Sequence, residues 1–272
     1  MSALSGIAER TASAASGILL ESPGELEDVL ATTFDDAGHP VGSSSFRVEI
    51  LEDGIRHMRV EMAVDGGGLN VSEALLEVVE NDAPSAREAS PAPGETVAPR
   101  HFRVLEEQSQ ATRADGVRLP FLVIDHRKGR VSCYPPDRDR TRGRHVEIGS
   151  EDRIVNVPMQ LLFQPLVSGE VDHLRFRIAT CKKGPVLYRI VAVRGPAGEY
   201  GGHRFVEIRY GPDLGNTVAW LASRLLPRFS FWFDRDSGRY LGHRMPLHRK
   251  GPEVLLIREG LRPGDLGLFD RN

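Results

Sequence analysis

The sequence has few cysteines, and this limits the kinds of fold that it can adopt. Its 272 residues include two cysteines, Cys133 and Cys181. Two cysteines are too few for the disulfide framework of a small secreted scaffold. One bridge between them and two buried free thiols remain as alternatives, and we expect free, reduced thiols.

Long hydrophobic runs are also absent. No stretch approaches the roughly 20 apolar residues that span a membrane, so we expect no transmembrane segment. Residues 1–20 carry Glu9 and Arg10 where a signal peptide would carry its apolar stretch. We therefore expect a cytoplasmic protein, or a periplasmic one if an export signal is missing from this chain.

An excess of basic charge is lacking as well. The net charge is −3 and the isoelectric point is near 6.3. Nucleic-acid binding without sequence preference depends on a basic field, so we expect no nucleic-acid partner. Phosphate-binding glycine loops, Gly-x-Ser-x-Gly, Cys-x-x-Cys and the metalloprotease helix do not occur in the sequence. His243 and His248 are five positions apart, which is no usual metal spacing. The sequence thus predicts no catalytic residue, metal or cofactor.

Alternating apolar and polar residues dominate the chain. Residues 46–50 and 58–64 alternate on either side of Asp53-Gly54, which is a typical hairpin turn. The other predicted strands cover residues 71–79 (or a short helix there), 102–109, 119–125, 130–134, 174–178, 186–194, 205–210, 229–234, 240–245 and 253–258. Parallel α/β folds need a crossover helix after most strands, so this order favours antiparallel pairing.

Two segments depart from this alternation and predict short helices. Residues 157–167 are apolar almost all round, with Pro158 suited to a first helical turn and Pro165 able to kink or end the helix. The second runs over 217–226, between Asn216 as an N-cap and Pro227. We therefore predict a mainly β fold: a large curled antiparallel sheet or half-barrel with one or two short helices packed in its concavity.

The chain is expected to form one large domain. Residues 1–25 read as an N-terminal tail or frayed helix, and residues 26–272 as a single β-rich domain. Residues 81–99 contain four prolines among serine, alanine and glutamate, a composition that cannot bury much apolar surface. We expect a flexible loop there.

The candidate ligand site is an apolar cup. The first helix, the second helix and the aromatic strand at 229–233 would each supply one side of it. Its predicted members are Leu162, Phe163, Leu166, Trp220, Leu221, Leu225, Phe229, Phe231 and Phe233, with Trp232 on the opposite strand face. The same residues could equally fill a solid core, since aromatic and aliphatic side chains are the usual core residues.

Two polar clusters have simpler interpretations than catalysis. The arginines at 138, 140, 142 and 144 with His145 could bind a phosphate, but Asp137 and Asp139 between them favour a self-compensated solvated loop. Asp125, His126 and Cys133 could form a thiol site, although a surface histidine and a core cysteine explain the same residues.

The C-terminal third carries a resemblance to a known family. The segments VEIRYGPDL, LPRFSFWFDRDSGRYLGHRMPL and GPEVLLIREGL lie within residues 206–261. This pattern resembles a bacterial family of β-rich domains of unknown function, usually exported and distantly similar to half-barrel carriers of the Lol type. The resemblance implies a curved antiparallel sheet around a helix and an apolar or lipid ligand.

Three functions remain open. The first is a non-enzymatic protein that holds a hydrophobic or lipid-like small molecule in the concavity of the sheet. The second is a structural or interaction domain with a filled core, which offers a sheet edge to a protein partner. The third is an unrecognised hydrolase or isomerase. An apolar cavity would favour the first function, and a filled core would favour the second. A pocket in which histidine and carboxylate side chains converge would favour the third.

Overall fold

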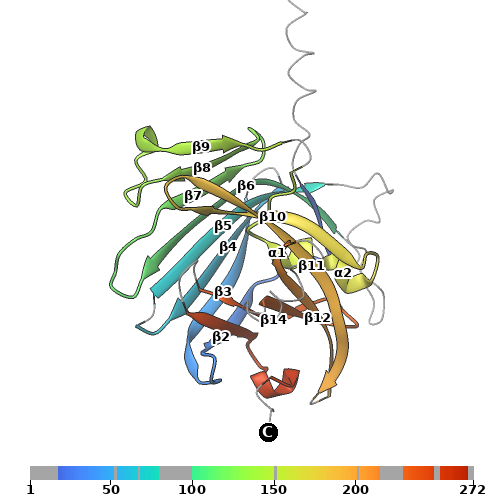
Figure 1. Cartoon of the computed structure of the whole chain (residues 1–272). Helices are drawn as coiled ribbons and strands as arrows, with labels where there is room; N and C mark the ends of the chain where they lie inside the picture. Colours follow the sequence, from blue (N-terminus) through green and yellow to red (C-terminus); the bar gives the residue numbers. More distant parts are fainter. Residues whose placement is uncertain are drawn as a thin grey trace, which may run out of the picture.

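The computed structural model describes residues 18–51, 54–66, 68–79, 100–149, 152–200, 202–214, 229–247 and 252–268. These residues form one curved, fifteen-stranded sheet (Figure 1). Every pairing between the named strands is antiparallel. The prediction of a mainly β, antiparallel fold is confirmed.

Twelve of the fifteen strands overlap the predicted segments, and most of these are longer than predicted; β1, β2 and β9 were not predicted. The first nine are β1 (Leu19–Ser22), β2 (Val29–Phe34), β3 (Pro40–Ile50), β4 (Ile55–Val64), β5 (Gly68–Val79), β6 (Arg100–Arg113), β7 (Phe121–Asp125), β8 (Arg130–Tyr134) and β9 (Arg144–Glu147). The other six are β10 (His173–Cys181), β11 (Pro185–Tyr200), β12 (His203–Pro212), β13 (Phe229–Asp234), β14 (Tyr240–Pro246) and β15 (Glu253–Arg258). Short 3-10 helices occur at η2 (Arg140–Arg142) and η3 (Pro263–Leu266).

The sheet consists of two meanders joined side by side. Strands β2 to β9 pair in sequence order, and so do strands β10 to β15. The pairing of β15 with β2 connects the two meanders. The sheet is not closed by strand pairing, because β9 lies at one end of this order and β10 at the other.

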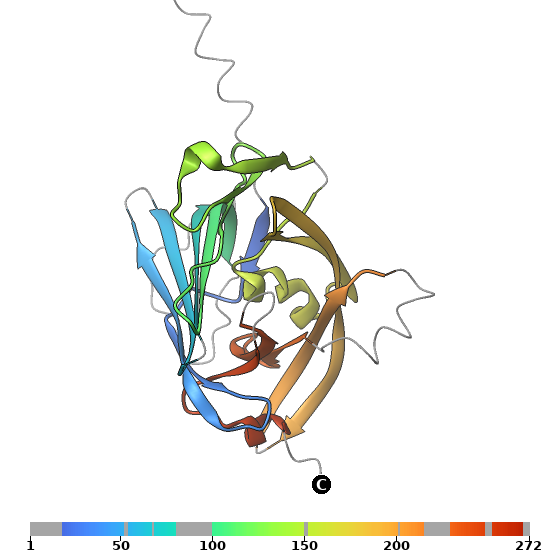
Figure 2. The same cartoon turned by 60° about the vertical axis from the view of Figure 1, so that its left-hand side comes forward.

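Two short helices lie inside the curve of the sheet (Figure 2). They are α1 (Met159–Leu162) and α2 (Gln164–Ser168), with Pro165 in the first turn of α2. This confirms the first predicted helix, divided into two. The second predicted helix, at 217–226, lies outside the described residues, as does the predicted loop at 81–99. No helix in the described ranges has the length and apolar character needed to span a membrane.

The N-terminal segment differs from expectation. Leu19–Ser22 forms strand β1 and pairs with Arg100–Arg103 of β6, where a tail or frayed helix was predicted. Strand β7 pairs farther along β6, at residues 106–109. The long strand β6 therefore supports two short strands, and the prediction missed β1 because its partner lies about eighty positions away in the sequence.

Alternation along the strands sorts side chains onto two faces of the sheet. Inward residues such as Met58, Val60 and Phe231 pack with the helices in one large cluster. Trp232, on the opposite face of β13 as predicted, packs with Leu255 and Ile257 in an outer cluster closed by Leu266 of η3. The helices thus fill part of the concavity, and their burial there explains why residues 157–167 are apolar almost all round.

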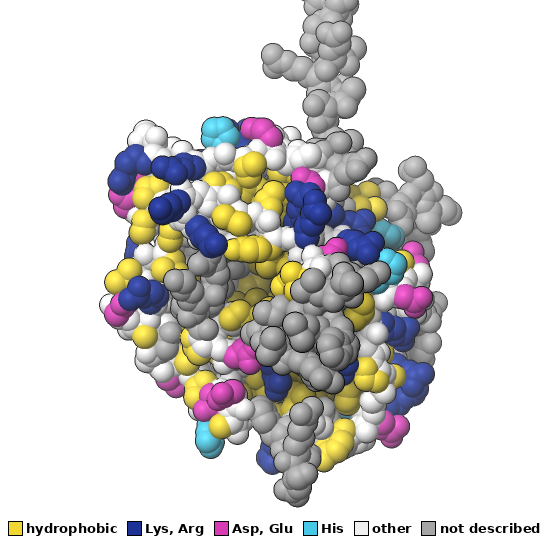
Figure 3. All heavy atoms as spheres, in the orientation of Figure 1, with side chains coloured by type: hydrophobic (Ala, Val, Ile, Leu, Met, Phe, Trp, Pro, Cys, Tyr) yellow, Lys and Arg dark blue, Asp and Glu magenta, His cyan; other side chains and the backbone are white. Residues whose placement is uncertain are grey.

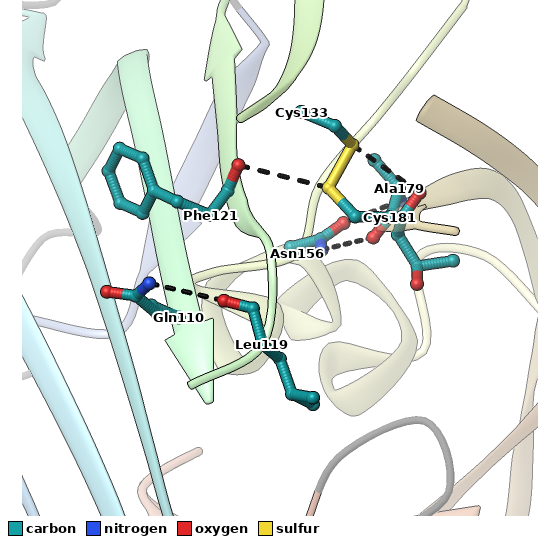
Figure 4. Close-up of a disulfide and its surroundings, with 8 residues drawn as sticks. Gln110, Leu119, Phe121, Cys133, Asn156, Ala179 and Cys181 are labelled. Atoms are coloured by element: carbon teal, nitrogen blue, oxygen red, sulfur yellow. Dashed lines mark hydrogen bonds between the residues drawn. A yellow bond between two sulfur atoms is a disulfide. The ribbon is translucent and has the colours of Figure 1, made fainter. Parts of the chain in front are cut away.

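The gap between the two ends of the sheet is bridged by the connector at residues 153–157, which links β9 to α1. Val155 N–H donates to the carbonyl of Arg177 on β10 (3.0 Å), and Arg177 N–H donates to the carbonyl of Arg153 (2.7 Å). Ala179 lies two residues beyond Arg177 on β10. The Asn156 side chain accepts a hydrogen bond from the N–H of Ala179 and donates one to its carbonyl, both at 2.8 Å (Figure 4). The connector backbone and the Asn156 amide thereby satisfy the free edge of β10 at Arg177 and Ala179.

A buried carboxylate holds the connector from the other side. Glu107 on β6 is 2% exposed, and one of its oxygens accepts from the backbone N–H groups of Asn156 (2.7 Å) and Val157 (2.6 Å). Its other oxygen lies 2.8 Å from Nε2 of His126, which is equally buried. Buried carboxylates need such partners, so this set fixes where the chain enters the interior of the sheet.

Cys133 of β8 and Cys181 of β10 form a disulfide across the same gap (Figure 4). The expectation of two reduced free thiols is wrong. The two cysteines are 48 positions apart in sequence, on strands from opposite ends of the sheet. Only the curvature of the sheet brings them together, which the sequence pattern could not show.

Removing this crosslink should destabilise the protein. We expect the double variant Cys133→Ser, Cys181→Ser to lose about 2–4 kcal/mol of unfolding free energy, because the unfolded chain regains its entropy. Urea denaturation followed by circular dichroism measures this loss. A reducing agent should lower the midpoint of the wild type and leave that of the double variant unchanged. Equal midpoints for the wild type with and without the reducing agent would contradict the crosslink.

Candidate functional site

A cavity of about 330 Å³, partly open to solvent, lies beside α1. Three sides of the interior contribute to its wall. The strands β3 to β6 supply Phe46, Val60, Met62, Asn70, Ser72 and Ser109; the connector and α1 supply Asn156, Val157, Met159 and Gln160. The second meander supplies Ile178, Thr180, Tyr188, Phe229, Phe231 and His243, followed by Met245, Pro246 and Leu247. In the space-filling view, hydrophobic side chains gather around a hollow near the middle of the face (Figure 3).

The wall of this cavity is mainly apolar, and its polar side chains are all uncharged types or histidine. None of its described lining residues is Asp, Glu, Lys or Arg. Several of its polar side chains have partners: Asn70 donates to the carbonyl of Leu247 (3.0 Å), and the Asn156 amide is used by β10. A cavity of this volume with a mainly apolar wall and neutral polar groups is typical of small-molecule sites.

His243 is the most unusual side chain in the wall. It is 2% exposed, and its ring stacks on Phe231 with a centroid separation of 4.7 Å. Its Nδ1 lies 2.6 Å from the Tyr240 hydroxyl, while Nε2 has no hydrogen-bond partner among the described residues. Burial lowers the pKa of His243 from 6.5 to about 3, so the ring is neutral at physiological pH.

A β-bulge places Tyr240 and His243 on the same face. Trp232 pairs with Gly242, but the next residue, Phe233, pairs with Tyr240, so Leu241 is the extra residue on β14. Leu241 packs in the outer cluster, whereas Tyr240 belongs to the inner one. Strict alternation would have put Tyr240 opposite to His243, and the bulge makes their hydrogen bond possible.

A second cavity, of about 440 Å³, lies near β1 and the other side of α1. Its wall includes Glu25, Glu27, Arg100 and Arg239. Glu25 and Arg100 form an ion pair at 2.5 Å. These charges suit a hydrated pocket, so the apolar cavity is the better candidate for a hydrophobic ligand.

The residues predicted for the cup fall into three groups. Phe229 and Phe231 line the apolar cavity. Leu162, Phe163, Leu166 and Phe233 are buried in the inner core beside it and do not contribute to its wall. Trp220, Leu221 and Leu225 lie outside the described residues.

The polar clusters have structural roles. Cys133 is held in the disulfide and His126 contacts Glu107, so no thiol–imidazole pair forms. In the basic loop, Arg142 pairs with Asp137 and Asp139, and the guanidinium of Arg138 lies over the Phe121 ring at 4.4 Å. The structure therefore agrees with the simpler interpretation of the basic loop. The interpretation of His126 as a surface histidine is wrong, because its ring is buried against Glu107.

Most of the cavity wall could not have been chosen from the sequence. Phe46, Val60 and Met62 belong to alternating strands and carry no mark that separates them from ordinary core residues. His243 has a usable signal, since apolar Leu241 and Met245 lie two positions away on either side of it, in the strand that follows the aromatic one. Its spacing from His248 suggested only a metal ligand, and the neighbours of His243 in the fold depend on the bulge.

Comparisons with known proteins concern the fold alone. No protein-family model matches the sequence, and no curated protein matches it. Among solved structures, the chain is similar to the crystal structure of a β-barrel-like protein of the domain of unknown function DUF1849 from Brucella abortus. The identity is 10%, the TM-score is 0.33, and the match covers 89% of this chain and 96% of the other.

Phe231 should contribute strongly to stability. It is 3% exposed and packs against the Phe163 ring at 5.2 Å as well as against His243. We expect Phe231→Ala to cost about 3–5 kcal/mol of unfolding free energy, measured by urea denaturation. Ile50→Ala, on a side chain that is 69% exposed, is the control and should cost less than about 0.5 kcal/mol. A loss below about 1 kcal/mol for Phe231→Ala would mean that the ring is loosely packed.

The buried His243 should make the protein sensitive to acid. Its folded-state pKa of about 3 lies below the ordinary 6.5, so between these values the unfolded chain binds a proton that the folded one does not. The stability that the folded protein has with a neutral His243 ring is fully present above about pH 6.5 and is lost as the pH falls toward 3. Between these limits the unfolding free energy of the wild type should fall more steeply than that of His243→Gln, by about 1.4 kcal/mol per pH unit.

Other titrating groups contribute to both curves, so the difference between the two proteins is the relevant quantity. Urea denaturation at a series of pH values gives it directly. His145→Gln, at an exposed position on β9, removes a histidine without removing a buried ring and should follow the wild type. Parallel curves for the wild type and His243→Gln would show that burial does not lower the pKa of His243 in the folded protein.

Proposed function

We propose that this protein is a non-enzymatic binding protein that holds a hydrophobic or lipid-like small molecule in the concavity of its sheet. The observation that carries the proposal is the cavity of about 330 Å³ whose described lining has no charged side chain. Transfer of apolar surface from water into such a wall is favourable by roughly 25 cal/mol per Å². The aromatic strand β13 contributes Phe229 and Phe231 to this surface.

The arrangement of the wall supports binding over catalysis. Its histidine has a tyrosine hydroxyl at Nδ1, where a catalytic base would commonly have a carboxylate to orient it. The buried histidine–carboxylate pair, His126 and Glu107, instead holds the connector through the backbone of Asn156 and Val157. These contacts favour the binding protein over an unrecognised hydrolase or isomerase.

We further propose that the protein works in an oxidising compartment such as the periplasm, the second of the two locations considered from the sequence. The Cys133–Cys181 disulfide supports this proposal, because such bridges persist mainly outside the reducing cytosol. An exported carrier would also fit the resemblance of residues 206–261 to half-barrel carriers of the Lol type. That likeness remains a prediction from the sequence.

Dye binding tests the cavity. The neutral apolar dye N-phenylnaphthylamine should bind to the wild type with a rise in fluorescence. Ser72→Phe should weaken binding at least tenfold, because Ser72 is buried in the cavity wall and the new ring would occupy the space of the dye. Such a loss corresponds to about 1.4 kcal/mol. Ser43→Phe makes the same change at an exposed position on β3 and should leave binding unchanged.

The same experiment separates the competing functions. Folding of each variant is checked by circular dichroism. A folded wild type that binds no dye would remove the carrier proposal and favour the interaction domain with a filled core. Equal loss of binding in both serine variants would place the dye elsewhere on the protein.

A further inference from the structure

We propose that His243 anchors the polar end of the ligand by donating a hydrogen bond from Nε2 to an uncharged oxygen acceptor, such as the carbonyl of an ester or amide. This inference rests on the proposed function. It defines the ligand class as an apolar molecule with a neutral acceptor group.

The geometry of the ring points to such a contact. Nδ1 is occupied by the Tyr240 hydroxyl at 2.6 Å, and Tyr240 lines the second cavity rather than the apolar one. His243 itself lines the apolar cavity. Its Nε2 is buried and has no hydrogen-bond partner in the described part of the chain. A buried polar atom without a partner is costly, so a bound acceptor would remove that cost.

The neighbouring tyrosine assigns the proton. A buried phenol needs an acceptor for its O–H, and Nδ1 of His243 is the acceptor at hand. A neutral imidazole that accepts at Nδ1 carries its proton on Nε2. A side chain that lines the cavity therefore carries a hydrogen-bond donor without a partner among the described residues.

An uncharged acceptor fits this donor better than a carboxylate or phosphate. Burial lowers the pKa of His243 to about 3, so the ring offers no positive charge near neutral pH. The described lining also contains no Lys or Arg. An anion in this cavity would lose its hydration without gaining a counter-ion, which is strongly unfavourable.

The ring is held in place before any ligand binds. It stacks on Phe231 and meets the Phe46 ring edge-on at 6.3 Å. The bulge at Leu241 brings Tyr240 to its Nδ1. A donor fixed in this way costs little entropy on binding, so one hydrogen bond can discriminate between ligands.

Three molecules with similar chains test the proposal: methyl decanoate, decane and the decanoate anion. Each competes with N-phenylnaphthylamine for the wild type near neutral pH. We expect methyl decanoate to bind about tenfold more tightly than decane, and decanoate to bind more weakly than methyl decanoate. In His243→Phe the preference for methyl decanoate over decane should fall below about twofold. His145→Phe, at an exposed site, is the control and should keep the wild-type preference.

The outcomes distinguish this inference from the proposed function. Failure of all three molecules and of the dye to bind would overturn the proposed function. Binding of decane as tightly as methyl decanoate by the wild type would overturn the anchor while leaving an apolar site. Tightest binding by decanoate would overturn the uncharged class.

A second measurement does not depend on any variant folding. Nitrogen–proton correlation NMR of the wild type reads the histidine tautomer. We expect the His243 proton on Nε2, with a resonance that shifts on addition of methyl decanoate and not of decane. A proton on Nδ1, or a resonance that methyl decanoate leaves in place, would overturn the proposal.

Discussion

The interior of this protein depends on how the free edge of β10 is satisfied. The sheet is open by strand pairing, and an exposed edge of this length would otherwise invite association with another chain. The connector at residues 153–157 and the Asn156 amide occupy the edge, Glu107 holds the connector, and the disulfide joins β8 to β10. Three kinds of contact therefore join the two ends of the sheet. Ile154 and Arg177 form a parallel β-bridge, the Asn156 amide takes the place of a backbone partner, and the disulfide is covalent.

The position of the cavity depends on these contacts across the gap between β9 and β10. The connector continues directly into α1, so the point at which Glu107 fixes the chain also sets where the helices enter the concavity. Phe163 and Leu166 fill the core there, while Met159 borders the cavity. Val157 and Ile178, from the two sides of the gap, are themselves part of the wall. The contacts that bridge the gap and the candidate site thus share residues, so a change in the bridging contacts should alter the cavity.

Much of the fold could be predicted because the residues involved act locally. Alternation marked the strands, and β13 and β15 were predicted with the bounds that the structure has, since each is flanked by turn residues. The apolar helix at α1 and α2 stood out because it breaks that alternation. The candidate site was less accessible to this reasoning. Phe229 and Phe231 were chosen for their aromatic rings, yet Phe233, two positions along the same strand face, is a core residue outside the wall.

The sequence by itself determined twelve of the fifteen strands, which of their faces is apolar, and that a short apolar helix must be buried, because these properties follow from periodicity of two or 3.6 residues. Tertiary structure alone decided which distant segments meet. The pairing of β1 with β6, the Cys133–Cys181 bridge and the contact of Asn156 with Ala179 join residues whose separation in sequence carries no signal. The position of His243 beside Tyr240 depends on one bulged residue, which reverses the parity that the sequence pattern implies. Long-range geometry, and not composition, therefore sets the chemistry of the cavity.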